Sequence, residues 1–287
     1  MKGKIWLAEK RGFCSGVERA VSLVRTAVKE GPYPVRVLHE IVHNESVVQE
    51  FTKLGVQFFE EPAADWNGGT LILSAHGVGS ALEEKIRSMP LKVIDATCPL
   101  VKRLHASAAE LEQNGFTLLF AGKRKHRETE GVAGRLAHPP VILETPEEAE
   151  AFSPKQNTRY AVISQTTLSV DDYESIIRTL KLKIPELHVS GGICQATTSR
   201  QYAVKELAKH CKRILVVGSE NSSNSRRLQE VAESAGANAI LIPDANALPD
   251  SFFEESGDIG ITGGASAPEH LITELIERFE ACGWVRA

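Results

Sequence analysis

An internal repeat built around three cysteines sets narrow limits on the fold. Cys14, Cys98 and Cys194 each follow a short apolar or β-branched run, and each precedes a segment with helical periodicity. The intervals between them are 84 and 96 residues, and 93 residues follow the last. Self-similarity of this kind is typical of related structural units, so we expect three units of about 90 residues.

Two further polar positions recur in each unit. The second position is occupied by His43, His126 and Ser222, which lie 29, 28 and 28 residues after their cysteines. Each of these again follows a strand-like run and precedes a helical pattern. Each unit therefore repeats its strand–loop–helix step at least once.

The third position is less regular. It is occupied by His76, Thr166 and Ser266, which lie 62, 68 and 72 residues after the cysteines. Strands that alternate with helices form parallel sheets, so the sequence predicts an α/β fold with small, parallel-rich sheets in three pseudo-equivalent units. Ligands gather at the carboxyl ends of such strands, and we expect the polar loops to face one central cavity. The alternative is a duplication that is only structural, with loops that point apart.

Composition and charge exclude several classes of protein. The chain has 287 residues, of which 42% are hydrophobic and 24% charged, as in ordinary globular proteins. Its net charge of −4 argues against a general nucleic-acid binder. It has no apolar run of about 18 residues that would span a membrane, and no signal peptide is evident. We expect a cytoplasmic protein, where disulfides are disfavoured.

The three repeated cysteines are candidate metal ligands. None of the five cysteines forms a CxxC pair, and Cys211 and Cys282 lie outside the repeat, where we expect buried apolar roles. Three thiolates from distant loops suit zinc in a Cys₃His set, or a four-iron cluster with one iron open to substrate. The spacing does not decide between them. The hydroxyl, amide and imidazole groups nearby would suit a phosphate, with donors at His43, His76, Ser222, Asn224 and Ser266.

Glu128 is the candidate proton donor. It lies two residues after His126, and in a strand-like loop an i, i+2 pair presents both side chains to one side. A partly buried carboxyl has a raised pKa and delivers protons near neutral pH. The alternative is that Glu128 belongs to a solvated charge run over 123–130.

Nine motifs, in order and at compatible spacing, resemble the LytB/IspH family, the 4-hydroxy-3-methylbut-2-enyl diphosphate reductases of isoprenoid biosynthesis. They are GFCSGVERA (12–20), VHNESVV (42–48), SAHGV (74–78), DATCPLV (95–101), HRETEG (126–131), QTTLSVDD (165–172), ICQATTSRQ (193–201), GSENSSNSRRL (218–228) and GGASAPE (263–269). The resemblance implies three α/β domains in a trefoil around a central cavity. We expect these domains at 16–98, at 99–190, and at 191–287 together with the N-terminal strand 1–15.

The resemblance also implies the site. Cys14, Cys98 and Cys194 match the ligands of an oxygen-sensitive [4Fe-4S] cluster, from which oxidation would leave a [3Fe-4S] form. The positions that match the diphosphate site are His43, His76, Ser222, Ser223, Asn224 and Ser266. Glu128, Thr166 and His126 match positions around the substrate hydroxyl. The implied products are isopentenyl and dimethylallyl diphosphate, and the implied electron donor is a ferredoxin or flavodoxin.

The chain departs from the family in the loop that carries Glu128. Arg127 stands where the family usually has proline, Thr129 where it has valine, and Val132 where it has threonine. Arg127 would either pair with Glu128 and lower its pKa or point to solvent. Other open interpretations are a divergent paralogue that acts on a related diphosphate, a zinc hydrolase, and a cluster or zinc protein without turnover.

Overall fold

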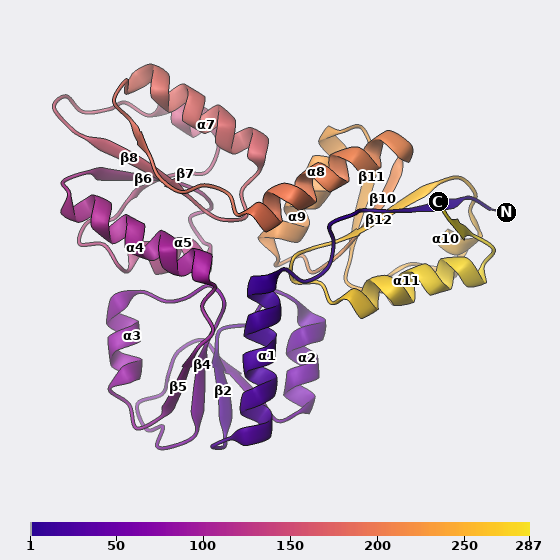
Figure 1. Cartoon of the computed structure of the whole chain (residues 1–287), viewed down its shortest axis with the longest axis horizontal. Coiled ribbons are helices and arrows are strands. Elements are labelled where there is room, and N and C mark those ends of the chain that lie inside the picture. The colour runs from indigo at the N-terminus through magenta and orange to yellow at the C-terminus, as the bar shows by residue number, and fades with distance from the viewer. Residues whose placement is uncertain (1) are drawn as a thin grey trace. The chain divides into compact units, whose positions relative to one another are not determined.

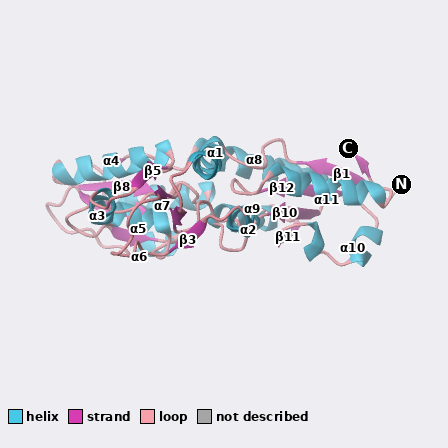
Figure 2. Ribbon diagram, turned by 90° about the horizontal axis from the view of Figure 1, so that it is seen from below, coloured by secondary structure: helices cyan, strands magenta, loops and turns pink. Residues whose placement is uncertain are grey.

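Helices and strands alternate along most of the chain in the computed structural model, which describes residues 2–287 (Figures 1 and 2). The strands form three small sheets, and every strand pair in them is parallel. The predicted α/β class with three small parallel sheets is therefore confirmed.

The chain separates into two compact units. The terminal unit comprises Met1–Glu18, His43–Glu50 and Gln195–Ala287, and the middle unit comprises Arg19–Val42 and Phe51–Cys194. The division into three domains around a central cavity stays a prediction. No helix among residues 2–287 combines the length and the apolar character that crossing a bilayer requires.

The first sheet of the middle unit has the strand order β3-β2-β4-β5. Its strands are β2 (Val35–Leu38), β3 (Gln57–Phe59), β4 (Thr70–Leu73) and β5 (Lys92–Asp95). The helices between and before these strands are α1 (Ser15–Glu30), α2 (Glu45–Lys53) and α3 (Ser80–Arg87). Leu71 and Leu73 of β4 are buried with Ile86 of α3, so α3 covers one face of this sheet.

The second sheet of the middle unit has the equivalent order β7-β6-β8-β9. Its strands are β6 (Thr117–Ala121), β7 (Val141–Leu143), β8 (Tyr160–Ser164) and β9 (His188–Val189). Its helices are α4 (Pro99–Gln113), α5 (Arg127–Ala133), α6 (Pro146–Ala151) and α7 (Val170–Lys183). Phe120 packs with Leu104 of α4, whereas its neighbour Leu119 packs with Ile176 of α7. Because successive strand residues face opposite sides, helices cover both faces.

The sheet of the terminal unit has the order β11-β10-β12-β1-β13. Its strands are β1 (Lys4–Leu7), β10 (Arg213–Val217), β11 (Asn238–Ile242), β12 (Ile259–Gly263) and β13 (Val285–Arg286). Its helices are α8 (Gln195–His210), α9 (Ser223–Ser234), α10 (Asp250–Glu254) and α11 (Glu269–Ala281), with a 3-10 turn at Ala245–Ala247. Val216 packs with Val204 of α8, and Leu215 packs with Leu275 of α11.

The three sheets place equivalent strands side by side. The strand that leads to each cysteine is β1, β5 or β9, and it pairs with β12, β4 or β8, the strand that leads to the third polar position. The same neighbour relation therefore recurs in all three sheets, as the cysteine positions recur in the sequence. It brings each cysteine loop next to the loop that carries Ser266, His76 or Thr166.

Candidate functional site

The three cysteines occupy equivalent corners between a strand and a helix. Each is the residue directly before a helix: Cys14 before α1, Cys98 before α4 and Cys194 before α8. Their backbone N–H groups donate to carbonyl oxygens in the loops that carry Ser266, His76 and Thr166. The acceptors are Ala265 at 3.1 Å, Ala75 at 3.0 Å and Thr166 at 3.1 Å, respectively. None of the three forms a disulfide, and all three residues are half-buried. The three cysteines therefore share one position at the start of a helix and one backbone hydrogen bond.

The three cysteines are divided between the two units, with Cys14 in the terminal unit and Cys98 and Cys194 in the middle unit. Among residues 2–287, no three His, Cys, Asp or Glu side chains gather closely enough to hold one metal ion. The convergence of the three thiols on a shared cluster stays a prediction.

The other two cysteines have packing roles. Cys211 is buried, its Sγ donates to the Leu207 carbonyl at 3.3 Å, and burial raises the pKa of its thiol to about 11. The predicted apolar role of Cys211 is confirmed. The prediction that Cys282 is buried was wrong, because it is only half-buried, although it packs against the core that contains Phe279.

Glu128 lies on a helix, so the prediction of a strand-like loop was wrong. His126 is the N-cap of α5, and its Nδ1 accepts a hydrogen bond from the Glu128 N–H at 3.2 Å. Because Nδ1 accepts this bond, the neutral His126 ring carries its proton on Nε2. A helix begins here because the imidazole satisfies a free N–H of the first turn, as a side-chain oxygen does at common N-caps.

Burial makes Glu128 a suitable proton donor. The residue is 2% exposed, so the alternative of a solvated charge run was wrong. Thr166 donates its N–H to one carboxyl oxygen at 2.7 Å and its hydroxyl to the other at 2.8 Å. Burial raises the pKa of Glu128 to about 7, although both Thr166 hydrogen bonds act to lower it. Desolvation of the charged form therefore outweighs two donors, and the carboxyl changes protonation near neutral pH.

The Glu128–Thr166 pair is joined directly to a cysteine loop. The Thr166 carbonyl accepts the Cys194 N–H at 3.1 Å, while the Thr166 N–H and hydroxyl hold Glu128. The rings of His76 and His126 lie 5.9 Å apart in an edge-to-face arrangement. The middle unit therefore brings together His76, His126, Glu128 and Thr166, which the sequence analysis selected separately.

The unusual residues around Glu128 have defined partners. Arg127 pairs with Glu130 at 3.0 Å and with Glu60, rather than with Glu128. Of the two alternatives for Arg127, the one in which it pairs with Glu128 and lowers its pKa is therefore wrong. Thr129 is 1% exposed, and its hydroxyl donates to the Lys123 carbonyl at 2.8 Å. This bond closes the loop before α5, where the family's proline is absent.

The terminal unit contains a cluster of buried hydroxyl groups at the start of α9. Ser222 is the N-cap of this helix, and its Oγ accepts the Ser225 N–H at 3.3 Å. The Ser266 hydroxyl lies 3.4 Å from the Ser222 Oγ and donates to the His43 carbonyl at 2.9 Å. Ser223 begins α9 and is half-buried. The structure thus brings together the predicted anion-binding residues of this unit.

Asn224 adds a side chain whose polar atoms lack a partner within the described residues. It is 5% exposed, and neither its Nδ2 nor its Oδ1 makes a hydrogen bond. A buried unpaired amide costs about 1–3 kcal/mol, so a ligand that pairs with it gains that energy. The amide, the nearby hydroxyls and the amino end of a 12-residue helix together fit a phosphate group.

Gln165, which was not predicted from the sequence, supports this site. It is 1% exposed, its Oε1 accepts the Lys123 N–H at 2.9 Å, and its Nε2 donates to the Thr167 hydroxyl at 2.7 Å. Gln165 therefore ties the loop before His126 to the loop that carries Thr166. Its position at the end of β8, the signal that selected Thr166, was available in the sequence.

Comparisons with known proteins agree with this geometry. A model of the LytB protein family matches residues 5–280. Two curated relatives named 4-hydroxy-3-methylbut-2-enyl diphosphate reductase come from Polaromonas sp. (strain JS666) and Neisseria gonorrhoeae (strain NCCP11945). The first is 42% identical over 284 residues, which cover 98% of this chain and 85% of the relative. The second is 43% identical over 288 residues, which cover 99% of this chain and 89% of the relative.

Two solved structures share the fold. The E-1-hydroxy-2-methyl-but-2-enyl-4-diphosphate reductase of Plasmodium falciparum matches with a TM-score of 0.90 and 31% identity, over 96% of this chain and 87% of the other. An (E)-4-hydroxy-3-methyl-but-2-enyl diphosphate reductase matches with a TM-score of 0.69 and 33% identity, over 98% of this chain and all of the other. The second protein is described as the terminal enzyme of the non-mevalonate pathway.

Proposed function

Because the chain belongs to the LytB protein family, we propose that this oxidoreductase removes the hydroxyl group of 4-hydroxy-3-methylbut-2-enyl diphosphate. Two electrons and two protons replace the C–OH bond by a C–H bond and release water. The products are isopentenyl and dimethylallyl diphosphate, in the last step of the methylerythritol phosphate pathway. The observation that carries the proposal is the buried Glu128 carboxyl with a pKa of about 7, which is bonded to Thr166, the residue whose carbonyl accepts the Cys194 N–H.

Cys14, Cys98 and Cys194 would hold a [4Fe-4S] cluster through one thiolate each. Their equivalent strand-to-helix corners support this assignment, and none of the three forms a disulfide. When bound, such a cluster supplies single electrons and a Lewis-acidic iron without a protein ligand. A ferredoxin or flavodoxin is the proposed electron donor.

The terminal unit would bind the diphosphate. The unpaired amide of Asn224 and the hydroxyl of Ser222 offer donors to phosphate oxygens. We assign Ser266 to the same site because its hydroxyl lies 3.4 Å from the Ser222 Oγ. The partial positive charge at the start of α9 favours the same anion. We assign His43, Ser223 and, from the middle unit, His76 to the same role on the resemblance of their motifs.

Glu128 would deliver the proton that lets the hydroxyl leave as water. Near pH 7 about half of its carboxyl groups carry a proton, which is the state a general acid needs. Thr166 orients the carboxyl through two hydrogen bonds, so the donor oxygen is held in one direction. His126 caps the helix that carries Glu128 and would contact the substrate hydroxyl.

The test is an anaerobic assay of the full chain after reconstitution with iron and sulfide. We expect a brown protein that absorbs near roughly 400 nm and consumes the hydroxymethylbutenyl diphosphate when a chemical reductant is supplied. A colourless, zinc-loaded and active protein would overturn the cluster assignment. A cluster-loaded protein that leaves this diphosphate unchanged would overturn the proposed reaction.

A variant pair tests the proton donor. Glu128→Gln is expected to keep its cluster and lose turnover by about a hundredfold or more, as for loss of a general acid. Glu130→Gln is the matched control because Glu130 lies on the same helix and is exposed. Equal turnover in both variants would remove Glu128 from the mechanism.

A further inference from the structure

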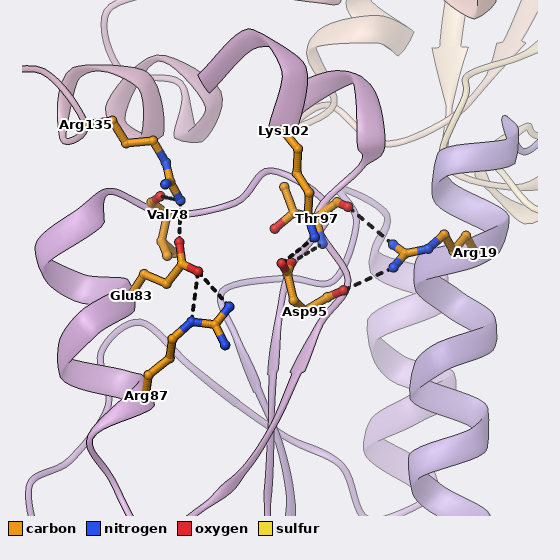
Figure 3. A network of polar contacts seen from close by, with 8 residues as sticks. All are labelled: Arg19, Val78, Glu83, Arg87, Asp95, Thr97, Lys102 and Arg135. Atoms are coloured by element: carbon orange, nitrogen blue, oxygen red, sulfur yellow. Dashed lines mark hydrogen bonds and ion pairs between the residues drawn. The ribbon is translucent and has the colours of Figure 1, made fainter. Parts of the chain in front are cut away.

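Each cysteine loop is held by a side chain from the helix that follows a different cysteine. Arg19 lies on α1, five residues after Cys14. Its Nη1 donates to the Thr97 carbonyl and its Nη2 to the Asp95 carbonyl, both at 3.2 Å (Figure 3). These two carbonyls belong to the segment that runs directly into Cys98. Arg19 therefore anchors the approach to the second cysteine.

The second contact also joins a helix that follows one cysteine to the segment before another, but through two hydroxyl groups. Ser107 lies on α4, nine residues after Cys98, and its hydroxyl is 2.8 Å from the hydroxyl of Ser190. Ser190 stands four residues before Cys194 and directly after β9. The helix that follows the second cysteine thus holds the approach to the third.

The third contact completes the series. Arg200 lies on α8, six residues after Cys194, and is 6% exposed. Its Nη2 donates to the Gly12 carbonyl at 2.7 Å, two residues before Cys14, and its Nη1 donates to the Ala196 carbonyl at 2.8 Å. The buried Arg200 guanidinium therefore links the segment before Cys14 to the first turn of α8, the helix that follows Cys194.

These segments need such support because two of the strands that lead to the cysteines lie at sheet edges. β5 and β9 each pair with a single neighbour, and β9 has only two residues. Short edge strands with few ladder bonds open more easily than central strands. Side-chain hydrogen bonds from Arg19 and Ser107 restrain the segments between these edge strands and the cysteines, which have no strand partner of their own.

We infer that Arg19, Ser107 and Arg200 are positioning residues for the three cysteine ligands. Each keeps one thiol at the position that a shared cluster requires, so the three contacts close a cycle from Cys14 to Cys98 to Cys194 and back. The inference rests on the proposed function, because it assumes that the three thiols hold one iron–sulfur cluster. It assigns to these residues the retention of the cluster and no contact with substrate.

The test measures retention of the cluster in the full chain. Arg19→Gln, Ser107→Ala and Arg200→Gln are reconstituted anaerobically, and bound iron and sulfide are measured before and during exposure to a ferrous-iron chelator. Loss of one or two hydrogen bonds is expected to speed cluster loss by about tenfold in each variant. Thermal unfolding of the same proteins without cluster reports any general effect on folding.

Arg103→Gln is the matched control. Arg103 lies on α4 five residues after Cys98, as Arg19 does after Cys14, but its exposed side chain makes no hydrogen bond or ion pair among residues 2–287. We expect it to lose its cluster at the wild-type rate. If Arg200→Gln fails to fold, Arg200→Lys keeps the charge, and Ser107→Thr keeps the hydroxyl. Both are expected to lose the cluster more slowly than the Gln and Ala variants.

Two outcomes separate this inference from the proposed function. Cluster loss at the wild-type rate in all three variants, or equal acceleration in Arg103→Gln, would overturn the positioning role alone. A wild-type chain that binds no cluster after reconstitution would overturn both proposals.

Discussion

Replacement of Glu128 by glutamine is expected to remove a pH-dependent loss of stability from the protein. Burial raises the pKa of the Glu128 carboxyl from 4.5 to about 7 in the folded chain. Between these two values the folded state binds a proton that the unfolded state has released. The stability contributed by the neutral carboxyl is therefore fully present below about pH 4.5 and is lost as the pH rises through 7.

The change in the free energy of unfolding follows from the change in the pKa of Glu128. One pKa unit corresponds to about 1.4 kcal/mol, so a carboxyl shifted from 4.5 to about 7 changes the free energy of unfolding by about 3 kcal/mol. Glutamine has nearly the same shape and no charge. Its Oε1 still accepts the Thr166 N–H, and its amide nitrogen donates to the Thr166 hydroxyl oxygen. The variant should fold without the cost of burying a carboxylate.

The assay compares urea unfolding of the wild type and Glu128→Gln from pH 5 to pH 8, with both proteins in the same cluster state. The difference between them cancels the other titrating groups. We expect the variant to gain about 3 kcal/mol relative to the wild type across this range. Glu130→Gln, whose side chain is half-exposed, should show no such trend. A difference that is constant with pH would refute the buried, neutral carboxyl.

Four further predictions follow from single contacts. Thr166→Val removes a donor that lowers the pKa of Glu128, so the alkaline limb of the kcat–pH profile should move to higher pH. His105 is buried and its pKa is lowered to about 4. The protein should therefore lose about 3 kcal/mol of stability as the pH falls from 6.5 to 4. Acid unfolding curves of His105→Gln should lack this loss. Thr129→Val leaves a loop carbonyl unpaired and should lower the free energy of unfolding by about 1 kcal/mol, measured in urea. Asn224→Ala should raise the KM for the diphosphate by about tenfold at unchanged kcat, and an unchanged KM would exclude the amide from binding.

The internal repeat was sufficient to predict the class of fold. Apolar runs before Cys14, Cys98 and Cys194, and helical patterns after them, place each thiol at a strand-to-helix corner. This part was predictable because strand and helix periodicity are local properties of the chain. The pairing of the strands that lead to the cysteines with β12, β4 and β8 was not predicted, because it depends on hydrogen bonds between segments distant in sequence.

The environment of Glu128 was not predictable from local pattern. The helix that carries it begins at a histidine N-cap, and histidine is outside the usual set of capping residues. The charge run over 123–130 suggested solvent, yet Glu128 is 2% exposed because residues distant in sequence cover it. Its two hydrogen bonds come from Thr166, 38 residues away. Arg127 likewise pairs with Glu60, which no local pattern could select.

The sequence alone therefore determined which residue types recur and on which kind of corner they stand, because periodicity and spacing are written in the order of residues. Only the tertiary structure decided that Glu128 is desolvated and holds a proton near pH 7, and that Asn224 is buried without a partner. It also showed that Arg19, Ser107 and Arg200 each reach the approach to another cysteine. Burial and long-range hydrogen bonds depend on which elements pack together, and that packing is a property of the whole fold.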